Sequence, residues 1–403
     1  MATPKLRFKE FDGDWSIKSL SELANLTSSK RVHLADYVPD GIPFFRGKEI
    51  TELKSGVFPS DILYISHNQF NEFKEKYGVP KNNEILITAV GTLANTYLVN
   101  TNYDFYFKDG NLIWLKDIKA DPKFMMILLD AKKNDVLASA IGSTQKALTI
   151  ANLNKLIFNF PSKEEQTKVA SFLSNVDEKI SQLTQKHELL NQYKQGMMQK
   201  LFSQQIRFKA DDGSEFGECE TTTLGQTGKF IGGGTPSKEN SEFWEGSIPW
   251  ISSSDLTEGS IFKINITRFI SQNALNQSAT KLVPANSILI VSRVGVGKVA
   301  ITPNEICTSQ DFTSLTLHKG SSIFFAYLIK SLTPYLLEMN QGTSIKGFIK
   351  DDLANLELKI PCIEEQTKIA NFLSAIDQKI EVVAEQIEQA KTWKKGLLQQ
   401  MFV

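Results

Sequence analysis

Polar and basic residues gather in several short stretches of this chain, some of them beside glycine. Arg46-Gly47-Lys48 and Ser292-Arg293 are two examples. Arginine and lysine can contact phosphates or guanine, asparagine and glutamine can pair with adenine, and serine and threonine can contact either. These stretches are candidates for binding a nucleic acid, although an ordinary solvated loop remains the alternative for each residue. The candidates are Lys30, Arg31, Arg46, Lys48, Thr88, Thr92, Asn95, Gln145, Lys146, Thr235, Ser237, Lys238, Ser252, Ser253, Ser292, Arg293, Lys298, Gln310 and Lys346.

Motifs for catalysis are weak in comparison. Gly295-Val296-Gly297-Lys298 resembles part of a phosphate-binding loop, but Val299 stands where that loop needs Ser or Thr. The four histidines are isolated, and the three cysteines are too scattered for a zinc site. The chain has no HExxH or GxSxG sequence. We therefore expect no catalytic, cofactor-binding or metal-binding residues in it.

The elements that must hold the candidate residues occur twice. Glu164-Glu165-Gln166-Thr167-Lys168 returns 200 residues later as Glu364-Glu365-Gln366-Thr367-Lys368. Residues 164–202 and 364–402 are identical at 17 of 39 positions without a gap. A repeat with this period is too long for a solenoid and predicts a duplicated domain plus helix.

Each copy of the repeat continues as a long amphipathic helix. Apolar residues recur at alternating spacings of four and three, which is a heptad seam of about five heptads. We predict that the two helices form an antiparallel coiled coil within the chain; the alternative is that each packs on its own domain. The seam residues are Val169, Leu173, Val176, Ile180, Leu183, Leu190, Ile369, Leu373, Ile376, Ile380, Val383 and Ile387.

The segments before the helices also correspond. Ile42-Pro43-Phe44 matches Ile248-Pro249-Trp250, and both halves contain a short β-like Ile-Leu-Ile run followed by a loop with glycine. Within that loop, Thr92-Leu93-Ala94-Asn95 aligns with Val296-Gly297-Lys298-Val299. Short apolar runs broken by Gly, Pro, Asn and Ser indicate mixed α and β structure.

The predicted fold class is therefore α+β. Two mixed α/β domains alternate with two long helices, and the whole is an internal pseudo-two-fold repeat. The predicted boundaries are 1–160 for the first domain, 161–202 for the first helix, 203–360 for the second domain and 361–403 for the second helix.

Composition limits the partners. Apolar residues make up 41% of the chain and charged residues 22%, which is typical of a soluble globular protein. The three scattered cysteines fit the reducing cytoplasm. No apolar run is long enough to span a membrane. Because 45 basic residues balance 45 acidic ones, the net charge is zero and does not itself indicate nucleic acid.

The combination of duplication, spacing and helix motif resembles the specificity (S) subunit of type I restriction–modification systems. The resemblance rests on the paired Pro-x-x-Glu-Glu-Gln-Thr-Lys helices, each ending Lys-x-Gly-x-x-Gln-x-x-Phe, and covers nearly the whole chain. It implies two target-recognition domains, each reading half of an asymmetric bipartite DNA site with a non-specific gap. It also implies that an antiparallel helix pair fixes the distance between these domains.

The same resemblance implies a subunit without catalytic activity. Its partners would be double-stranded DNA, two modification subunits that use S-adenosylmethionine, and two restriction subunits that use ATP and Mg. Two other classes remain open: a non-DNA scaffold that binds proteins, and part of a single-chain restriction enzyme. Steep weakening of binding by salt would distinguish DNA binding from the scaffold.

Overall fold

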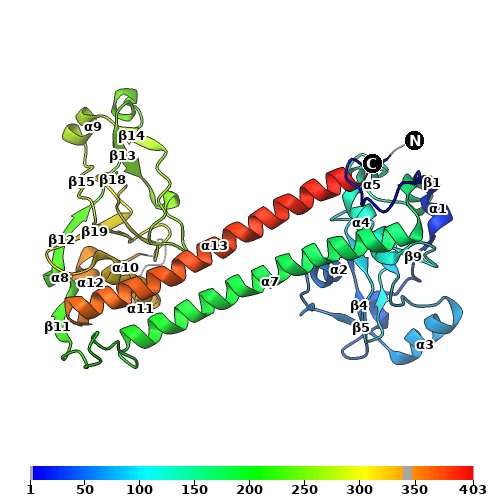
Figure 1. Ribbon diagram of the computed structural model, residues 1–403, viewed down its shortest axis with the longest axis horizontal. Helices are drawn as coiled ribbons and strands as arrows, with labels where there is room; N and C mark the ends of the chain where they lie inside the picture. Colours follow the sequence, from blue (N-terminus) through cyan, green and yellow to red (C-terminus); the bar gives the residue numbers. More distant parts are fainter. Residues whose placement is uncertain (1–2, 339–346, 403) are drawn as a thin grey trace. The chain divides into compact units, whose positions relative to one another are not determined.

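The structure, a computed structural model, describes residues 3–338 and 347–402 (Figure 1). The chain divides into two compact units. The first unit comprises Met1–Gln182 together with Gln386–Val403, and the second unit comprises Leu183–Glu385. Each unit therefore contains one set of strands and one end of each of two long helices.

In the part of the first unit that the structure describes, there are three sheets, with strand orders β1-β10, β2-β9-β6-β7 and β3-β5-β4-β8. Its strands are β1 (Ser16–Ser19), β2 (Asn25–Thr27), β3 (Tyr37–Val38), β4 (Ile42–Phe45), β5 (Leu63–Ile65), β6 (Ile85–Thr88), β7 (Thr96–Leu98), β8 (Tyr106–Phe107), β9 (Leu112–Lys116) and β10 (Ile157–Phe160). Its short helices are α1 (Leu20–Leu23), η1 (Leu34–Asp36), α2 (Gly47–Lys54), α3 (His67–Lys76), α4 (Pro122–Ala131), α5 (Lys133–Ala138) and α6 (Ile150–Leu153).

Within its described residues, the second unit also contains three sheets, with orders β11-β20, β12-β19-β16-β17 and β14-β13-β18-β15. Its strands are β11 (Glu220–Thr223), β12 (Gly228–Gly232), β13 (Ile248–Ile251), β14 (Arg268–Ile270), β15 (Leu282–Val283), β16 (Ile288–Val291), β17 (Val299–Ile301), β18 (Ile306–Thr308), β19 (Phe312–Leu317) and β20 (Glu357–Ile360). Its short helices are α8 (Leu224–Thr227), η2 (Ser241–Trp244), η3 (Ser253–Asp255), α9 (Gln272–Gln277), α10 (Ser322–Ser331), α11 (Thr333–Glu338) and α12 (Lys350–Ala354).

The two units repeat one frame around a buried central strand. All four residues of β6 are buried, and so are all four of β16, as continuous apolar runs predict for strands covered on both faces. Ile85 of β6 pairs with Leu115 of β9, and Ile288 of β16 pairs with Leu315 of β19. The mixed α/β fold and the internal repeat predicted from the sequence are confirmed.

The register corrects one detail of the sequence alignment. The β6–β7 and β16–β17 pairs have the same register, which makes Asn95 equivalent to Lys298. The alignment of Asn95 with Val299 is therefore wrong by one residue. In the corrected register, Ala94 with a φ of 58° and Gly297 with a φ of 97° occupy the same left-handed position, although only the second is glycine.

The frame differs at the edge of one sheet. The parallel pair β4-β8 of the first unit corresponds to the parallel pair β13-β18 of the second. An antiparallel strand pairs with the first strand of each, β5 with β4 and β14 with β13. The fourth strand differs. In the first unit β3 pairs with β5, whereas in the second unit β15 pairs with β18. The outer parts of the two domains are thus built differently on one core.

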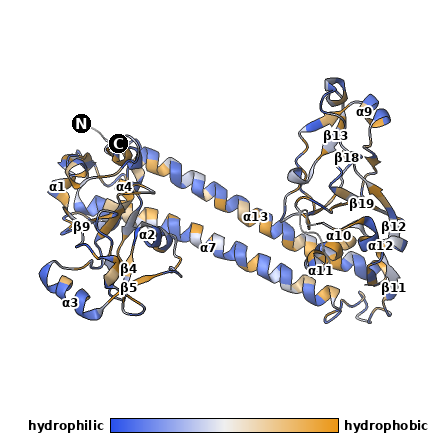
Figure 2. Cartoon of the chain, turned by 180° about the vertical axis from the view of Figure 1, so that it is seen from behind, coloured by the Kyte–Doolittle hydropathy of each residue, from blue (hydrophilic) through white to orange (hydrophobic). Residues whose placement is uncertain are grey.

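The long helices are α7 (Lys163–Phe202) and α13 (Ile363–Met401), and hydrophobic positions recur along both among hydrophilic ones (Figure 2). In the first unit, Leu173 shares a core with Phe124 of α4 and with Leu397 of α13. Each helix start therefore packs both on its own domain and on the other helix, so the two alternatives from the sequence hold together. Among the predicted seam residues, Val169, Leu173, Val176, Leu183, Ile369, Leu373, Ile376, Val383 and Ile387 are buried, while Ile180, Leu190 and Ile380 are partly buried.

Contacts within each unit show that the two helices run antiparallel. In the first unit, the ring of Phe172 near the start of α7 lies 6.0 Å from the ring of Trp393 near the end of α13. In the second unit, the roles are exchanged, and Phe372 lies 6.5 Å from Tyr193. Among the described residues, no helix is long and apolar enough to cross a membrane.

Candidate nucleic-acid interface

Three segments meet beyond the end of the central strand in each unit. In the first unit, the Ala89 amide donates to the Asn111 carbonyl (2.7 Å), and the Leu148 amide donates to the Ala89 carbonyl (2.9 Å). In the second unit, the Ser292 amide donates to the Asp311 carbonyl (2.8 Å) in the same way. These backbone bonds fix the loop after the central strand, so its side chains can vary without changing the frame.

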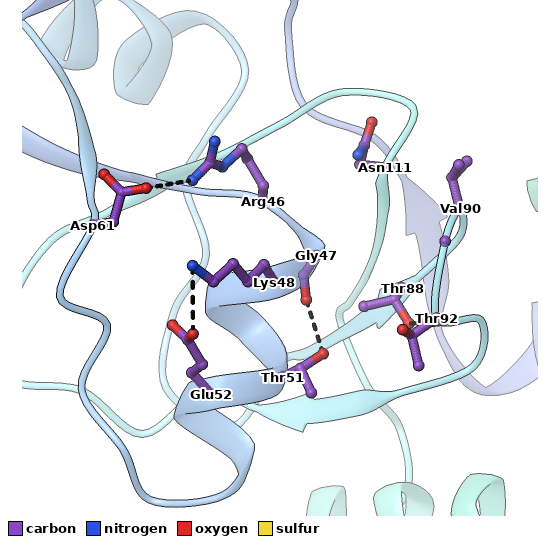
Figure 3. Close-up of a pocket in the computed structure, with 11 residues that line it drawn as sticks. Arg46, Gly47, Lys48, Thr51, Glu52, Asp61, Thr88, Val90, Thr92 and Asn111 are labelled. Atoms are coloured by element: carbon purple, nitrogen blue, oxygen red, sulfur yellow. Dashed lines mark hydrogen bonds and ion pairs between the residues drawn. The ribbon is translucent and has the colours of Figure 1, made fainter. Parts of the chain in front are cut away.

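The first unit has a cavity of about 690 Å³ at this place (Figure 3). It lies between the start of α2 and the loop that joins β6 to β7. Four of the predicted site residues line it, namely Arg46, Lys48, Thr88 and Thr92. The structure therefore brings together candidates that are up to 46 residues apart in the sequence.

Arg46 lies at the cavity but is held by the protein itself. Its Nη2 atom lies 2.5 Å from Oε1 of Glu49, which is buried, and its backbone amide donates to Oε2 of Glu49 (2.7 Å). The hydrogen bond to Glu49 raises the pKa of Arg46 above its ordinary value. Burial acts to raise the pKa of Glu49, but the bonds from Arg46 outweigh it and the pKa is lowered. This pair caps the start of α2, and Lys48 lies on the surface of the same first turn.

Thr88 and Asn95 shape the loop from inside. Thr88 is buried, and its hydroxyl donates to the Thr92 carbonyl and accepts from the Asn95 amide (2.9 Å). The Asn95 side chain donates to the Thr51 hydroxyl (3.1 Å) and accepts from Lys133 (2.9 Å). Both side chains therefore stabilise the loop.

The remaining polar groups at the cavity are more open. The Lys48 side chain is 62% exposed, with its Nζ atom 3.8 Å from Glu52, and Thr92 is exposed. Asn111 also lines the cavity, and it was missed by the sequence reasoning because no motif or cluster marks it. Among the described residues, no group makes a hydrogen bond to its side-chain amide, which is half-buried. Its place just before β9 could have been a signal, because β9 runs antiparallel to β6 and so begins at the edge where β6 ends.

The other candidates of the first unit lie outside this cavity. Lys30 is exposed with its Nζ atom 4.5 Å above the Tyr77 ring, and Arg31 is paired with Asp109 (3.1 Å). Gln145 and Lys146 are exposed on the turn closed by the bridge between residues 141 and 147. That turn precedes Leu148 and so leads to the same loop after β6.

In the second unit, the segment after β13 is stabilised differently. Asp255 takes the place of Glu49, but its guanidinium partner is Arg268 from β14, which also donates to the Ser252 hydroxyl (2.7 Å). Lys298 donates to the carbonyls of Ser253 (3.2 Å) and Leu256 (3.1 Å). Ser253 is buried, and Lys298 supports η3, so this lysine is not free to hold a phosphate as in a nucleotide-binding loop.

Arg293 is the open cation of the second unit's loop. It is exposed, and no ion pair or hydrogen bond of its side chain is present among the described residues. Ser292, by contrast, is buried and bonded to Asp311 and Thr313. Elsewhere in the unit, Thr235 donates to Gln310 (2.5 Å), the Ser237 hydroxyl accepts from the Glu239 amide (3.3 Å), and Lys238 is exposed. Lys346 lies outside the described residues.

The repeated Glu-Glu-Gln motif of the helices has a structural explanation. Glu165 is buried and binds Arg7 through two hydrogen bonds of 2.8 and 2.7 Å; Glu365 binds Arg207 through two of 3.2 and 2.5 Å. The following glutamine, at 166 or 366, accepts from the amide that begins α4 or α10. The motif thus ties each long helix to its own domain. Among the described residues, no group of three or more His, Cys, Asp or Glu side chains could hold a metal ion.

Together, the fold and the site define a duplicated binding protein, in which one frame carries two different sets of exposed polar side chains. The sequence matches the family described as Type I restriction modification DNA specificity domain over residues 12–192 and again over 217–392. The chain belongs to this family.

Relatives and solved structures agree with the match. The type I restriction enzyme MjaVIII specificity subunit of Methanocaldococcus jannaschii is 24% identical over 90% of both chains. The S subunit structure of a type I restriction–modification system from M. genitalium superposes with a TM-score of 0.60 at 19% identity and covers 100% of this chain and 99% of its own. A chain from a structure on complex assembly and conformational transition of the type I R-M system has a TM-score of 0.61 at 18% identity, covering 97% and 98%.

Proposed function

We propose that the chain is the DNA-recognition subunit of a type I restriction–modification complex. Residues 1–160 and 203–360 act as two target-recognition domains, and each reads one half of an asymmetric bipartite site with a non-specific gap. The observation that carries this proposal is the shared frame with unlike polar side chains at equivalent positions, such as Asn111 in one domain against Asp311 in the other. Two domains that share a backbone framework but carry different polar side chains are suited to recognising two different DNA sequences.

We also propose that residues 161–202 and 361–403 are spacers that set the length of the gap. A helix of 40 residues such as α7 is about 60 Å long at 1.5 Å per residue. Half-sites read from one face of duplex DNA have centres about 34–36 Å apart, so the helix is long enough for this purpose. Inserting one heptad near Gln185 keeps the seam in phase and adds about 10.5 Å. The gap should lengthen or activity should fall, and an unchanged gap with full activity would refute the spacer role.

Membership of the family supports a proposal about the partners. We propose that the chain binds two modification subunits, which supply S-adenosylmethionine chemistry, and two restriction subunits, which supply ATP- and Mg-dependent chemistry, all in the cytoplasm. The chain itself would contribute recognition without catalysis. Because its net charge is zero, the isolated chain should bind DNA weakly. Basic residues of the partner subunits would then supply further phosphate contacts.

The test is a comparison of DNA methylation in host cells with and without the chain. We expect one bipartite word to be methylated only when the chain is present together with its modification subunits. Methylation of DNA by the purified chain alone would refute the non-catalytic role. Binding of DNA that does not weaken as salt rises would favour the scaffold alternative over recognition of DNA.

A further inference from the structure

The cavity of the first unit is poorly suited to a phosphate. Its charged lining residues are Arg46 and Lys48 against Glu52 and Asp61, and the Arg46 charge is already matched by buried Glu49. Asp61 also lines the cavity, is 80% exposed and lies 3.9 Å from Arg46, so an exposed carboxylate adds to the charge of the lining. A phosphate placed there would meet more negative than positive charge. Base edges, which present both donors and acceptors, fit this mixed lining better.

Two neighbouring lining residues have side chains that are free to read such an edge. Asn111 presents an amide without a hydrogen-bond partner among the described residues, and Val90 beside it presents an apolar side chain (Figure 3). Asparagine pairs in bidentate fashion with N6 and N7 of adenine, and apolar side chains contact the thymine methyl group. Together the two side chains complement the groups that an A·T pair presents in the major groove.

The second unit has a different pair at the equivalent positions. Because the amides of Ala89 and Ser292 donate to the carbonyls of residues 111 and 311, Asn111 corresponds to Asp311. The residue after each amide donor is Val90 in one unit and Arg293 in the other. Arginine pairs with O6 and N7 of guanine, and aspartate accepts from N4 of cytosine. Arg293 is exposed, and one Asp311 oxygen accepts from Ser309 (3.0 Å), which leaves acceptor capacity on the carboxylate.

We propose that residues 90 and 111, and the equivalent residues 293 and 311, are specificity-determining pairs. Val90 with Asn111 reads an A·T pair in the first half-site, and Arg293 with Asp311 reads a G·C pair in the second. The backbone bonds around them are the same, so the exchange of two side chains changes the base pair without changing the frame. This inference rests on the proposed function.

The test uses the chain assembled with its modification subunits. The probe is a library of DNA duplexes randomised in both half-sites, with sequencing of the methylated products. Asn111→Ala should relax the preference at one position of the first half-site by roughly 5- to 150-fold, the range expected for one bidentate contact. The second half-site should be unchanged. The matched control is Asn102→Ala, an exposed asparagine of the same unit outside the cavity, which should leave both half-sites unchanged.

Exchange variants make the prediction sharper. Val90→Arg with Asn111→Asp should convert the A·T preference to G·C at that one position, and Arg293→Val with Asp311→Asn should do the reverse in the second half-site. Asn111→Asp alone should shift the preference toward cytosine, and it keeps the test valid if the larger Val90→Arg change prevents folding.

The outcomes separate this inference from the proposed function. If the unaltered complex methylates no sequence that depends on this chain, the proposed function fails. If it has a word that Asn111→Ala leaves unchanged, the pair assignment alone fails. A uniform loss of binding to all sequences, with a shallower dependence on salt, would mean that Asn111 contacts the DNA backbone, and would also overturn the assignment.

Discussion

The two units have the same framework but stabilise it with different side chains. In both, the glutamate of the helix motif binds an arginine 158 residues earlier, and the same backbone bonds hold the loop after the central strand. They differ in how well individual polar groups are shielded from solvent. Between the two long helices, the second unit shields an ion pair that the first leaves partly exposed to solvent. This difference shows that a duplicated frame tolerates local change once its backbone bonds are fixed, and it can be measured by matched substitutions.

The largest difference in stability between the two units is expected where the two long helices pack against each other. In the second unit, Lys194 pairs with Asp377 at 2.5 Å, and their side chains are 8% and 12% exposed. The Tyr327 hydroxyl covers the pair and donates to Asp377 (2.6 Å). In the first unit, the equivalent pair of Lys394 and Asp177 is 28% and 48% exposed.

Asp377→Ala should therefore lower the free energy of unfolding by about 3–5 kcal/mol, because it leaves a buried lysine without its partner. Asp177→Ala should cost only about 0–1 kcal/mol. Urea unfolding of the full chain measures both. The double variant Lys194→Met with Asp377→Leu should recover most of the loss. Equal losses in the two units would show that the burial of the second pair has no energetic consequence.

The arginines that bind the helix motif give a smaller difference. In the first unit, Trp15 Nε1 also donates to Glu165 (3.3 Å). The equivalent position in the second unit is Cys219, and among the described residues no side chain other than Arg207 donates to Glu365. Arg207→Ala should thus cost about 1.5–3 kcal/mol of stability, because it leaves a buried carboxylate unpaired.

Arg7→Ala should cost less than Arg207→Ala, since Trp15 still donates to the glutamate. The same urea experiment compares them. A larger loss for the Arg7 variant would mean that the tryptophan bond does not compensate.

The pH dependence of stability should also differ between the units. Burial lowers the pKa of Lys330 in the second unit to about 8. Between pH 8 and the ordinary value of 10.5, the unfolded chain keeps a proton that the folded chain has lost, so this residue makes stability rise with pH. Burial raises the pKa of Tyr327, and above pH 10 that residue opposes the rise because the folded chain keeps the phenol proton.

Lys330→Met should therefore flatten the stability profile between about pH 8 and 10, whereas Lys319→Met, at an exposed position, should not. Thermal unfolding at several pH values tests this. An unchanged profile in the Lys330 variant would assign the rise to other groups.

Rearranging the chain ends should have the smallest effect. In the first unit, the Leu6 amide donates to the Gln400 carbonyl (3.0 Å), so the two terminal segments lie side by side. A permutant with new ends near Gln204-Gln205 and a short linker between residues 403 and 1 should fold and give the same methylated word. A permutant that folds but no longer assembles with its partners would show that the connection after α7 has a role of its own.

The sequence predicted the repeated frame well. Heptad spacing and the Ile-Leu-Ile runs depend on local periodicity, which a sequence displays directly, and the antiparallel helices and the central strands follow from them. The motif Glu165-Gln166 was visible as a repeat, but its partners were not, because Arg7 and the start of α4 are brought to it by the tertiary fold.

The site was less predictable. Clusters of polar residues identified Lys48 and Arg293, which are exposed, but also Thr88 and Ser292, which are buried and hold loops. A sequence shows the type of a side chain and not whether a neighbour already uses its hydrogen bonds. Asn111 was missed for the same reason, since its free amide is a property of the folded loop.

The central claim is that each domain reads its own half-site. Exchange of residues 1–160 for the first domain of another family member, assembled with the modification subunits, tests it most directly. Sequencing of the methylated DNA should show that one half of the bipartite word changes while the other half is retained. A change in both halves, or in neither, would contradict the account.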